Sequence, residues 1–296
     1  MTALDVVTPG PLTLLQDLGR PGRQGQGVAP SGAFDRGAHD RAQRLVGNDP
    51  VAAGLEVLLG PFTAVARGDV VVAVTGPVGA VTVDGRPEAG ETALVVRDGA
   101  RLELGPAVGG LRLVVAVRGG LDVPPVLGSR SRDVGGGIGP PPVAAGDVLP
   151  VGTLARDQPH YGVLVPPRGG EGPVVLELAP GPHDDALDGA GWEVLERARW
   201  EVGGRSDRMG VRLTSPGFRP AGAGELASFP VVPGCVQLTP SGELVVLGPD
   251  AGVTGGYPVL GVVPSPGLDV LAQARPGAVV GVRRRTRRGP GRSRGL

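Results

Sequence analysis

Short apolar runs separated by glycine and proline fill most of the chain, and this punctuation limits the folds that it can adopt. Runs such as VVVAV, LRLVVAV and VVLEL have the length and β-branched content of strands. The 54 glycines and 32 prolines supply turns between them. Asp84-Gly85, between two apolar runs, predicts a tight hairpin. Strands outnumber helices and do not alternate with them, which indicates a mainly β protein.

Three stretches have helical periodicity instead, at 34–46, 184–198 and 267–274. In the first two, apolar residues recur every three or four positions on one face, which predicts helices packed on a sheet. The third stretch follows Ser265-Pro266, a pair that predicts a capping serine with proline in the first turn.

A weak internal repeat divides the chain in two. Residues 109–129 align with 242–262, and a Pro-Val-Leu-Gly segment coincides in the two copies. Each copy has the order of an apolar strand, a loop with glycine and aspartate, and an apolar strand that opens with proline. We therefore predict two similar β lobes, at 1–155 and 156–282, joined through linker-like sequence.

Charge is distributed unevenly along the chain. All 29 basic residues are arginines, and the end of the sequence, RRRTRRGPGRSRGL, contains no acid. We expect 283–296 to be a solvated, disordered tail rather than a nucleic-acid or membrane-binding segment. The lack of lysine excludes a Schiff base, a P-loop lysine and a biotin-carrying lysine on this chain.

The remaining composition favours a cytoplasmic protein without a metal. Cys235 is the lone cysteine, so no disulfide forms within the chain. His39, His160 and His183 lack metal-ligand spacing. The first residues do not have the pattern of a secretory signal, and no apolar run is long enough to span a membrane.

The stretch at 15–49 is a first candidate site. Asp17, Arg20 and Ser31 lie in glycine-containing turns, and Ser31 or Asp35 stands where a helix begins. A helix N-terminus beside an arginine favours an anion. Capping of the helix also explains Ser31 and Asp35, and the spacing alone favours that structural role.

Two further candidates lie in the second half. Arg205, Arg208 and Arg212 flank Met209-Gly210, where a guanidinium fork suits a carboxylate or a phosphate; pairing with Asp207 at a strand edge is the structural alternative. The glycine-rich loop at 250–258 offers side chains and backbone N–H groups that could converge on a ligand. A wide loop that binds no ligand would have the same composition, so composition alone does not distinguish the two.

Taken in this order, the segments resemble the family described as allophanate hydrolase subunit 2, the C subunit of 5-oxoprolinase or biotin-dependent carboxyltransferase. The stretches that carry the resemblance are TPGPLTLLQDLGRPG, SGAFD, LVGND, LEVLLGPF, VAVRGGLDVPPVLGSRS, SDRMGVRL, PGCVQLTPSGELVVLGPDAGVTGGYP and LAQARPG. They span almost the whole chain and end before the arginine-rich tail.

The resemblance implies two cyclophilin-like β-barrel lobes with a few short helices. It also implies one component of an ATP-dependent 5-oxoprolinase, a hydrolase that converts 5-oxoproline to L-glutamate and is active only as a hetero-oligomer. A relative of the 5-oxoprolinase B subunit would be the direct partner, with a relative of the A subunit as a further one. The alternatives are the carboxyltransferase subunit of a biotin-dependent urea carboxylase-like enzyme, with biotin on another chain, or a non-catalytic regulatory partner of a B-subunit relative.

Residue roles follow from the same resemblance. We interpret Asp250 and Thr254 as catalytic, with the loop amides polarising a carbonyl, and Arg20 or Arg208 as the anchor of the substrate carboxylate. The other predicted substrate-binding residues are Asp17, Ser31, Asp35, Met209, Gly255, Gly256 and Tyr257. The chain departs from the family at Gln43, where asparagine is usual, and at Gly252, where glutamine is common.

Overall fold

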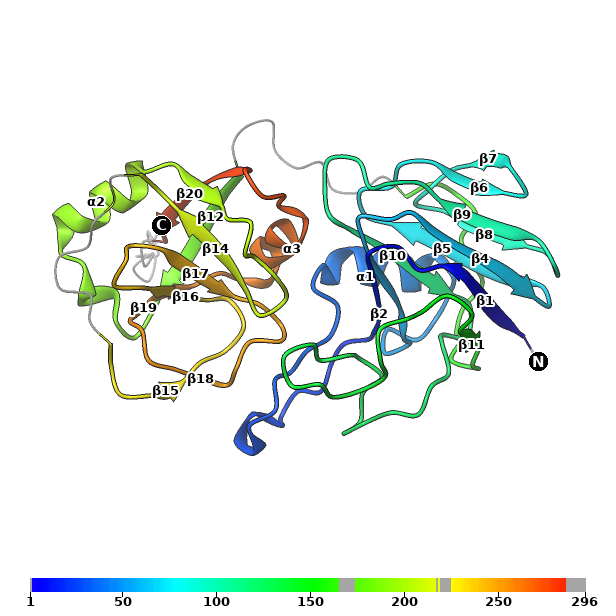
Figure 1. Ribbon diagram of the computed structural model, residues 1–296, viewed down its shortest axis with the longest axis horizontal. Helices are drawn as coiled ribbons and strands as arrows, with labels where there is room; N and C mark the ends of the chain where they lie inside the picture. Colours follow the sequence, from blue (N-terminus) through cyan, green and yellow to red (C-terminus); the bar gives the residue numbers. More distant parts are fainter. Residues whose placement is uncertain (1, 165–173, 217, 219–224, 286–296) are drawn as a thin grey trace, which may run out of the picture.

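The computed structural model describes residues 2–164, 174–216, 218 and 225–285. Two β lobes lie side by side, and two helices, α1 (Arg36–Leu45) and α3 (Ser265–Gln273), face each other between them (Figure 1). The predicted tail lies outside the described residues from 286 onward, as does the 165–173 part of the predicted linker.

The first lobe consists of two antiparallel sheets around one core. The larger sheet has the strand order β11-β1-β4-β9-β6-β7, and the smaller has the order β2-β3-β10-β5-β8. The elements are β1 (Ala3–Thr8), β2 (Leu12–Gln16), η1 (Gln24–Gln26), β3 (Gly54–Leu58), β4 (Phe62–Arg67), β5 (Val70–Thr75), β6 (Val81–Val83), β7 (Arg86–Glu88), β8 (Ala93–Val96), β9 (Arg101–Leu104), β10 (Arg112–Val117) and β11 (Val148–Pro150).

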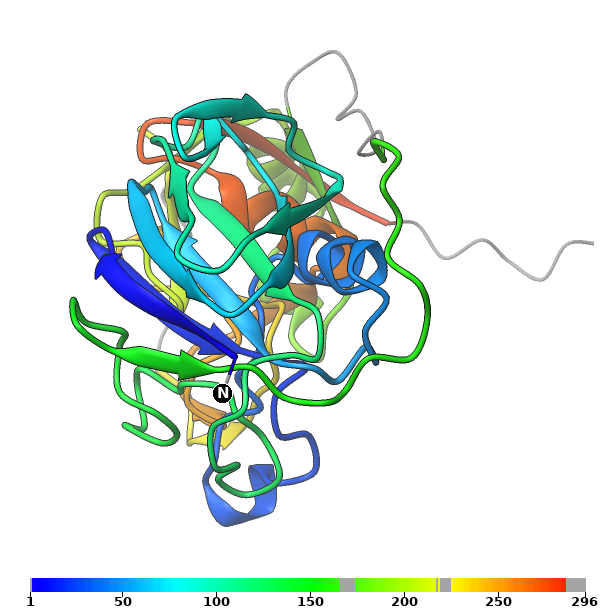
Figure 2. The same cartoon turned by 90° about the vertical axis from the view of Figure 1, so that its right-hand side faces the viewer.

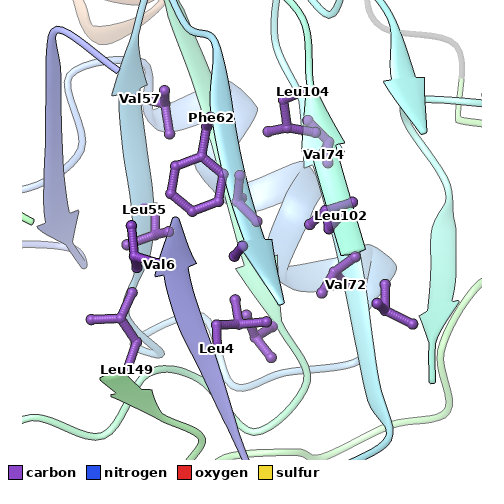
Figure 3. Packing of buried hydrophobic residues seen from close by; sticks show 14 of the residues in the cluster. Leu4, Val6, Leu55, Val57, Phe62, Val72, Val74, Leu102, Leu104 and Leu149 are labelled. Carbon is purple, nitrogen blue, oxygen red and sulfur yellow. The ribbon is translucent and has the colours of Figure 1, made fainter. Parts of the chain in front are cut away.

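Alternating side chains of these strands form the core of the first lobe. Figure 3 shows Leu55 and Val57 of β3 opposite Phe62 of β4 and Leu102 of β9, all of them fully buried. On the outer face of the smaller sheet, α1 lays its predicted apolar stripe of Ala38, Ala42 and Leu45 over β5 and β10. The sheet is therefore apolar on both faces, and α1 has a fixed position on it.

The second lobe is a closed barrel with the strand order β12-β19-β16-β17-β14-β13-β20. Its core surrounds Trp200, whose indole N–H donates to the Leu195 carbonyl at 3.1 Å and whose ring meets Phe218 edge-on. The elements are β12 (Val174–Pro180), η2 (Asp184–Ala186), α2 (Gly189–Arg197), β13 (Trp200–Val202), β14 (Gly210–Thr214), β15 (Phe229–Pro230), β16 (Cys235–Leu238), β17 (Leu244–Leu247), β18 (Thr254–Gly255), β19 (Val259–Val262) and β20 (Val279–Arg284).

The mainly β class is confirmed, and the structure refines it at the first lobe. There the described strands pair into two sheets, whereas in the second lobe seven described strands close into a barrel and β15 and β18 form a separate two-stranded sheet. The Asp84-Gly85 hairpin is also confirmed, since both residues have the positive φ angles (50° and 73°) of a type I′ turn.

Several predicted boundaries were wrong. The helix expected at 184–198 is split, because Asp188 caps a new start by accepting from the Gly191 N–H at 2.6 Å. Ser265 is the first residue of α3 and makes no capping hydrogen bond. The strand predicted at Pro125 in the repeat is a tight turn between Val126 and Ser129.

The tail prediction also began too early. Arg283 and Arg284 belong to β20, which pairs in parallel with β12, and the Arg284 guanidinium lies 4.9 Å from the centre of the Trp192 ring. These two arginines are therefore part of the barrel.

Helix α3 belongs to the second lobe but is docked on the first, where it lies beside α1 (Figure 2). The Gln273 side-chain oxygen accepts from the N–H groups of Leu111 and Arg112, at 2.9 and 2.8 Å. Its amide nitrogen donates to Asp35 at 2.7 Å and to the Arg112 carbonyl at 3.0 Å. One side chain thus satisfies both strand and helix groups of the other lobe.

We expect Gln273→Ala to lower the free energy of unfolding by about 1 to 3 kcal/mol, because it leaves backbone N–H groups at the lobe interface without an acceptor. Urea unfolding measures the loss, with Gln26→Ala on the protruding η1 turn as the control. Equal midpoints for the two variants would contradict the docking role of Gln273.

Candidate functional site

A buried network of four charges joins the two lobes. Arg208, in the loop before β14, donates to Glu56 of β3 at 2.7 Å and to Asp250, after β17, at 2.8 and 3.1 Å. Arg112 of β10 contributes the second cation, with its Nε 3.3 Å from Glu56. All four side chains are buried, and two positive charges balance two negative ones.

The environment of Glu56 shows why this balance is needed. Burial raises the pKa of the Glu56 carboxyl, but the charges of Arg208 and Arg112 outweigh burial, and the pKa falls below its ordinary value. The Phe34 N–H, which donates to Glu56 at 2.8 Å, acts in the same direction. Glu56 therefore stays ionised inside the protein.

Ser31 brings the first lobe into contact with the glycine-rich loop. Its hydroxyl donates to Asp250 at 2.6 Å, and its N–H donates to the Pro249 carbonyl at 2.8 Å. Ser31 holds a left-handed conformation, with φ of 56°, which is costly for a residue other than glycine. Arg208 and Asp250 thus lie together, and Ser31 of the first candidate site, which the sequence placed apart from them, joins them across the lobe interface.

Arg208, which we interpreted as one of two candidate anchors for a substrate carboxylate, is engaged within the protein. All three of its guanidinium nitrogens donate inside the protein, the last of them to the Gly32 carbonyl at 2.7 Å. Asp250 accepts through both oxygens, with the Val134 N–H as a further donor at 3.1 Å. All three guanidinium nitrogens and both carboxylate oxygens are thus engaged within the protein, and we name the network the lobe-to-lobe clamp.

The rest of the glycine-rich loop does not line this interface as one unit. Thr254 is exposed on β18, which pairs with β15, whereas Asp250 is buried. Gly255 packs against the Gln237 amide so closely that a Cβ atom would collide with it. Gly256 and Tyr257 lie between β18 and β19 and are half-buried. The structure therefore does not gather these residues around Asp250, and their convergence on a ligand stays a prediction.

A second polar cluster holds the loops of the first lobe. Asp17 accepts from the Ser129 and Ser131 hydroxyls, each at 2.6 Å, and from the N–H groups of Gly19 and Arg130. With four internal donors, Asp17 holds these loops together, and its contact with a substrate stays a prediction. Buried Arg20 donates to the Ser131 carbonyl, and its Nη1 has no partner in the described residues.

Asp35 has the structural role that the capping alternative described. One oxygen accepts from the Ala38 N–H at 2.8 Å as the N-cap of α1, and the other accepts from Gln273. Gln43, the departure from the family pattern, accepts from Asn48 at 2.7 Å and donates to the Ala52 carbonyl. Both the oxygen and the nitrogen of the Gln43 side chain, which is one methylene longer than that of asparagine, therefore have hydrogen-bond partners.

Two cavities flank the clamp on the lobe interface. The first, which we name the polar seam cavity, has a volume of about 220 Å³ and is lined by Pro30, Ser31, Ala33, Phe34, Arg36, Pro233, Pro249, Ser265, Leu268 and Asp269. The second, the apolar seam cavity, has a volume of about 270 Å³ and is lined by Leu12, Leu58, Leu59, Leu111, Arg112, Val134, Ser206, Asp207, Arg208, Met209 and Pro276.

Arg36 and Asp269 give the polar seam cavity its charges, and sequence reasoning missed both. Asp269 of α3 accepts from the N–H groups of Arg36 and Gly37, at 2.9 and 3.2 Å, and so sits on the N-terminus of α1. Burial and the neighbouring Asp35 raise the pKa of the Asp269 carboxyl. No local pattern in the sequence distinguishes Asp269, because its partners lie in the other lobe.

Clustered metal-ligating side chains and long apolar helices are both absent from the described residues. No group of three or more His, Cys, Asp or Glu side chains is arranged there to hold a metal ion. Within the same residues, no helix has the length and apolar character that crossing a bilayer requires.

Comparison with known proteins identifies the family and relatives of this chain. Residues 26–284 match the family described as carboxyltransferase domain, subdomain A and B. The chain is 35% identical to the C subunit of 5-oxoprolinase from Escherichia coli, over 91% of this chain and 87% of that protein. It is 30% identical to urea amidolyase of Saccharomyces cerevisiae, over 93% of this chain but 16% of that protein.

Solved structures give the same relationship. The crystal structure of TTHA0988 matches 95% of this chain with a TM-score of 0.85 and 35% identity, and this chain spans 56% of it. The Kluyveromyces lactis urea carboxylase structure matches with a TM-score of 0.85 and 27% identity, and this chain spans 27% of that protein.

We expect Arg208→Ala to lower the free energy of unfolding by about 3 to 5 kcal/mol, because it leaves buried Asp250 without a cation. The matched control is Arg205→Ala, since exposed Arg205 reaches Glu243 at 3.7 Å and such a pair contributes about 0 to 1 kcal/mol. Urea unfolding compares the variants. A fully stable Arg208→Ala protein with weakened substrate binding would restore the anchoring role.

Buried His39 of α1 makes stability depend on pH. Burial lowers the pKa of its imidazole below 6.5, and the charges of Asp17 and Glu56 offset only part of this effect. A depressed folded pKa contributes stability that is present above the unfolded pKa and is lost as the pH falls through the folded pKa.

We therefore expect the melting temperature to fall as the pH is lowered below 6.5. The fall should be shallower in His39→Leu, which cannot acquire the buried charge. Melting curves over a pH series test this, and parallel curves for the two proteins would contradict it.

Proposed function

The chain belongs to the family described as carboxyltransferase domain, subdomain A and B, and on this premise we propose that it is a subunit of a 5-oxoprolinase. The complex would open the lactam of 5-oxoproline to L-glutamate with consumption of ATP. A relative of the 5-oxoprolinase B subunit would contact this chain directly, a relative of the A subunit would complete the complex, and we place the assembly in the cytoplasm.

One observation carries the proposal. The likeness to the C subunit of E. coli 5-oxoprolinase reaches 35% identity and covers 91% of this chain and 87% of that protein. The Haemophilus influenzae protein of the same name is 30% identical over 94% of this chain and 89% of its own length. The correspondence therefore involves both lobes and the interface between them.

The structure supports a role in binding a small molecule. The polar seam cavity, of about 220 Å³, is smaller than the roughly 300 to 1,000 Å³ of sites for drug-sized ligands. A lactam acid is small enough for such a cavity, whereas a nucleotide is not. The chain also lacks a phosphate-binding lysine. We accordingly place ATP on another chain of the complex, with no binding residue assigned to it here.

A biotin-dependent carboxyltransferase is the second candidate. The 30% identity to yeast urea amidolyase and the TM-score of 0.85 to K. lactis urea carboxylase favour it. Biotin would arrive on another chain, because this one has no lysine to carry it. The third hypothesis, a non-catalytic regulator of a B-subunit relative, requires only that the partner bind.

We expect the isolated chain to be inactive toward 5-oxoproline, and ATP-dependent glutamate release to appear when the A and B subunits are added. Avidin blotting of the complex distinguishes the second candidate, since a biotinylated partner would favour carboxyltransfer. Partner binding without any turnover would favour the regulatory hypothesis. Turnover by the purified chain alone would contradict the requirement for a complex.

A further inference from the structure

Arg36 and Asp269, which belong to opposite lobes, both line the polar seam cavity. Arg36 is exposed at the start of α1, and its one side-chain hydrogen bond among the described residues goes to the Leu18 carbonyl at 3.2 Å. Asp269 is half-buried on α3. The Arg36 charge acts on the Asp269 carboxyl, yet the described structure has no ion pair between them. The two charges therefore face the same cavity without neutralising each other by contact.

The Asp269 carboxyl has a fixed orientation. Each of its oxygens accepts one backbone N–H from the first turn of α1, at 2.9 and 3.2 Å. A carboxylate oxygen has two lone pairs, so each retains the capacity for another donor. Arg36 likewise keeps donors beyond the one that it gives to Leu18.

The other walls suit a small saturated ring. Pro30, Pro233 and Pro249 line the cavity together with Leu268. Proline has no N–H, and these rings offer rigid apolar surface. A ligand with an apolar ring edge, one anionic group and one N–H donor matches this lining.

We propose that the polar seam cavity binds the lactam acid itself, with Arg36 holding the carboxylate and Asp269 accepting the ring N–H. This assignment rests on the proposed function and names its substrate subsite. A guanidinium–carboxylate contact is a strong, charge-assisted interaction, and the carboxyl of Asp269 is preorganised by the helix. The same two contacts suit the carboxylate and amino group of the ring-opened product.

The apolar seam cavity does not offer this combination. Its two arginines, Arg112 and Arg208, are engaged with Glu56 in the clamp. Its carboxylate, Asp207, accepts from the N–H groups of Met209 and Gly210 through one oxygen, and four leucines contribute to the remaining wall. No cation is left there for a carboxylate.

The test uses two probes that share the lactam ring, 5-oxoproline and 2-pyrrolidinone, which lacks the carboxylate. Equilibrium titrations are made with the chain alone and in complex with its partner subunits. Arg36→Ala should weaken the binding of 5-oxoproline about tenfold or more and leave that of 2-pyrrolidinone unchanged. Asp269→Asn should weaken both. The controls are Arg44→Ala and Asp40→Asn, which break an exposed pair on α1.

Three results would overturn the subsite. These are the absence of saturable 5-oxoproline binding in both forms of the protein, equal affinities of Arg36→Ala and Arg44→Ala, and an equal loss for both probes in Arg36→Ala. Melting curves separate a loss of folding from a loss of binding, and Arg36→Lys, which keeps the charge, should recover part of the affinity for 5-oxoproline.

The outcome is distinguishable from that of the proposed function. If the reconstituted complex turns over 5-oxoproline and Arg36→Ala has the wild-type KM, the subsite is wrong and the function stands. If the chain binds 5-oxoproline through Arg36 but no complex hydrolyses it, the subsite stands and the function is wrong.

Discussion

The guanidinium of Arg208 lies between two carboxylates that belong to different lobes, Glu56 and Asp250. A buried charge without a partner costs several kcal/mol, so each of these groups is tolerated only while the lobes keep this arrangement. Such a network adds little net stability compared with apolar packing. We interpret it instead as the device that selects one relative position of the lobes, because a displaced lobe would leave at least one charge buried and unpaired.

The polar seam cavity depends on that selection. Arg36 and Asp269 come from different lobes, and their separation is constant only if the lobes do not move. Docking of α3 reinforces the clamp, since Gln273 and Arg275 both donate to backbone carbonyls of the first lobe. We therefore expect the cavity to be preformed, so that a ligand meets groups that are already oriented and loses little free energy in ordering them.

Local features were predictable from the sequence, and contacts between the lobes were not. The stripe of α1 and the Asp84-Gly85 turn depend on neighbouring residues, and both are present. Glu56 within LEVLLG and Arg112 within LRLVVAV are lone charges in apolar strands, a sign that each has a partner. The sequence could not name that partner. For this reason the contact of Arg208 with Asp250 agrees with the sequence analysis, while the contacts of Ser31 and Glu56 with this pair were not predicted.

Two glycines of the glycine-rich loop, Gly252 and Gly255, differ in whether the fold requires a glycine there. Gly255 has no room for a side chain because Gln237 occupies the space, so its glycine is a packing requirement. Gly252 is exposed, lacks a positive φ, and would bring a Cβ atom within 4 Å only of the Thr254 carbonyl, at 3.8 Å. Nothing in the fold therefore demands glycine at 252, and the glutamine common in the family would fit.

Gly252 borders a third cavity, of about 230 Å³, beside Arg205, Met209 and Arg212. The missing amide changes the polarity of that cavity and leaves the clamp and the polar seam cavity untouched.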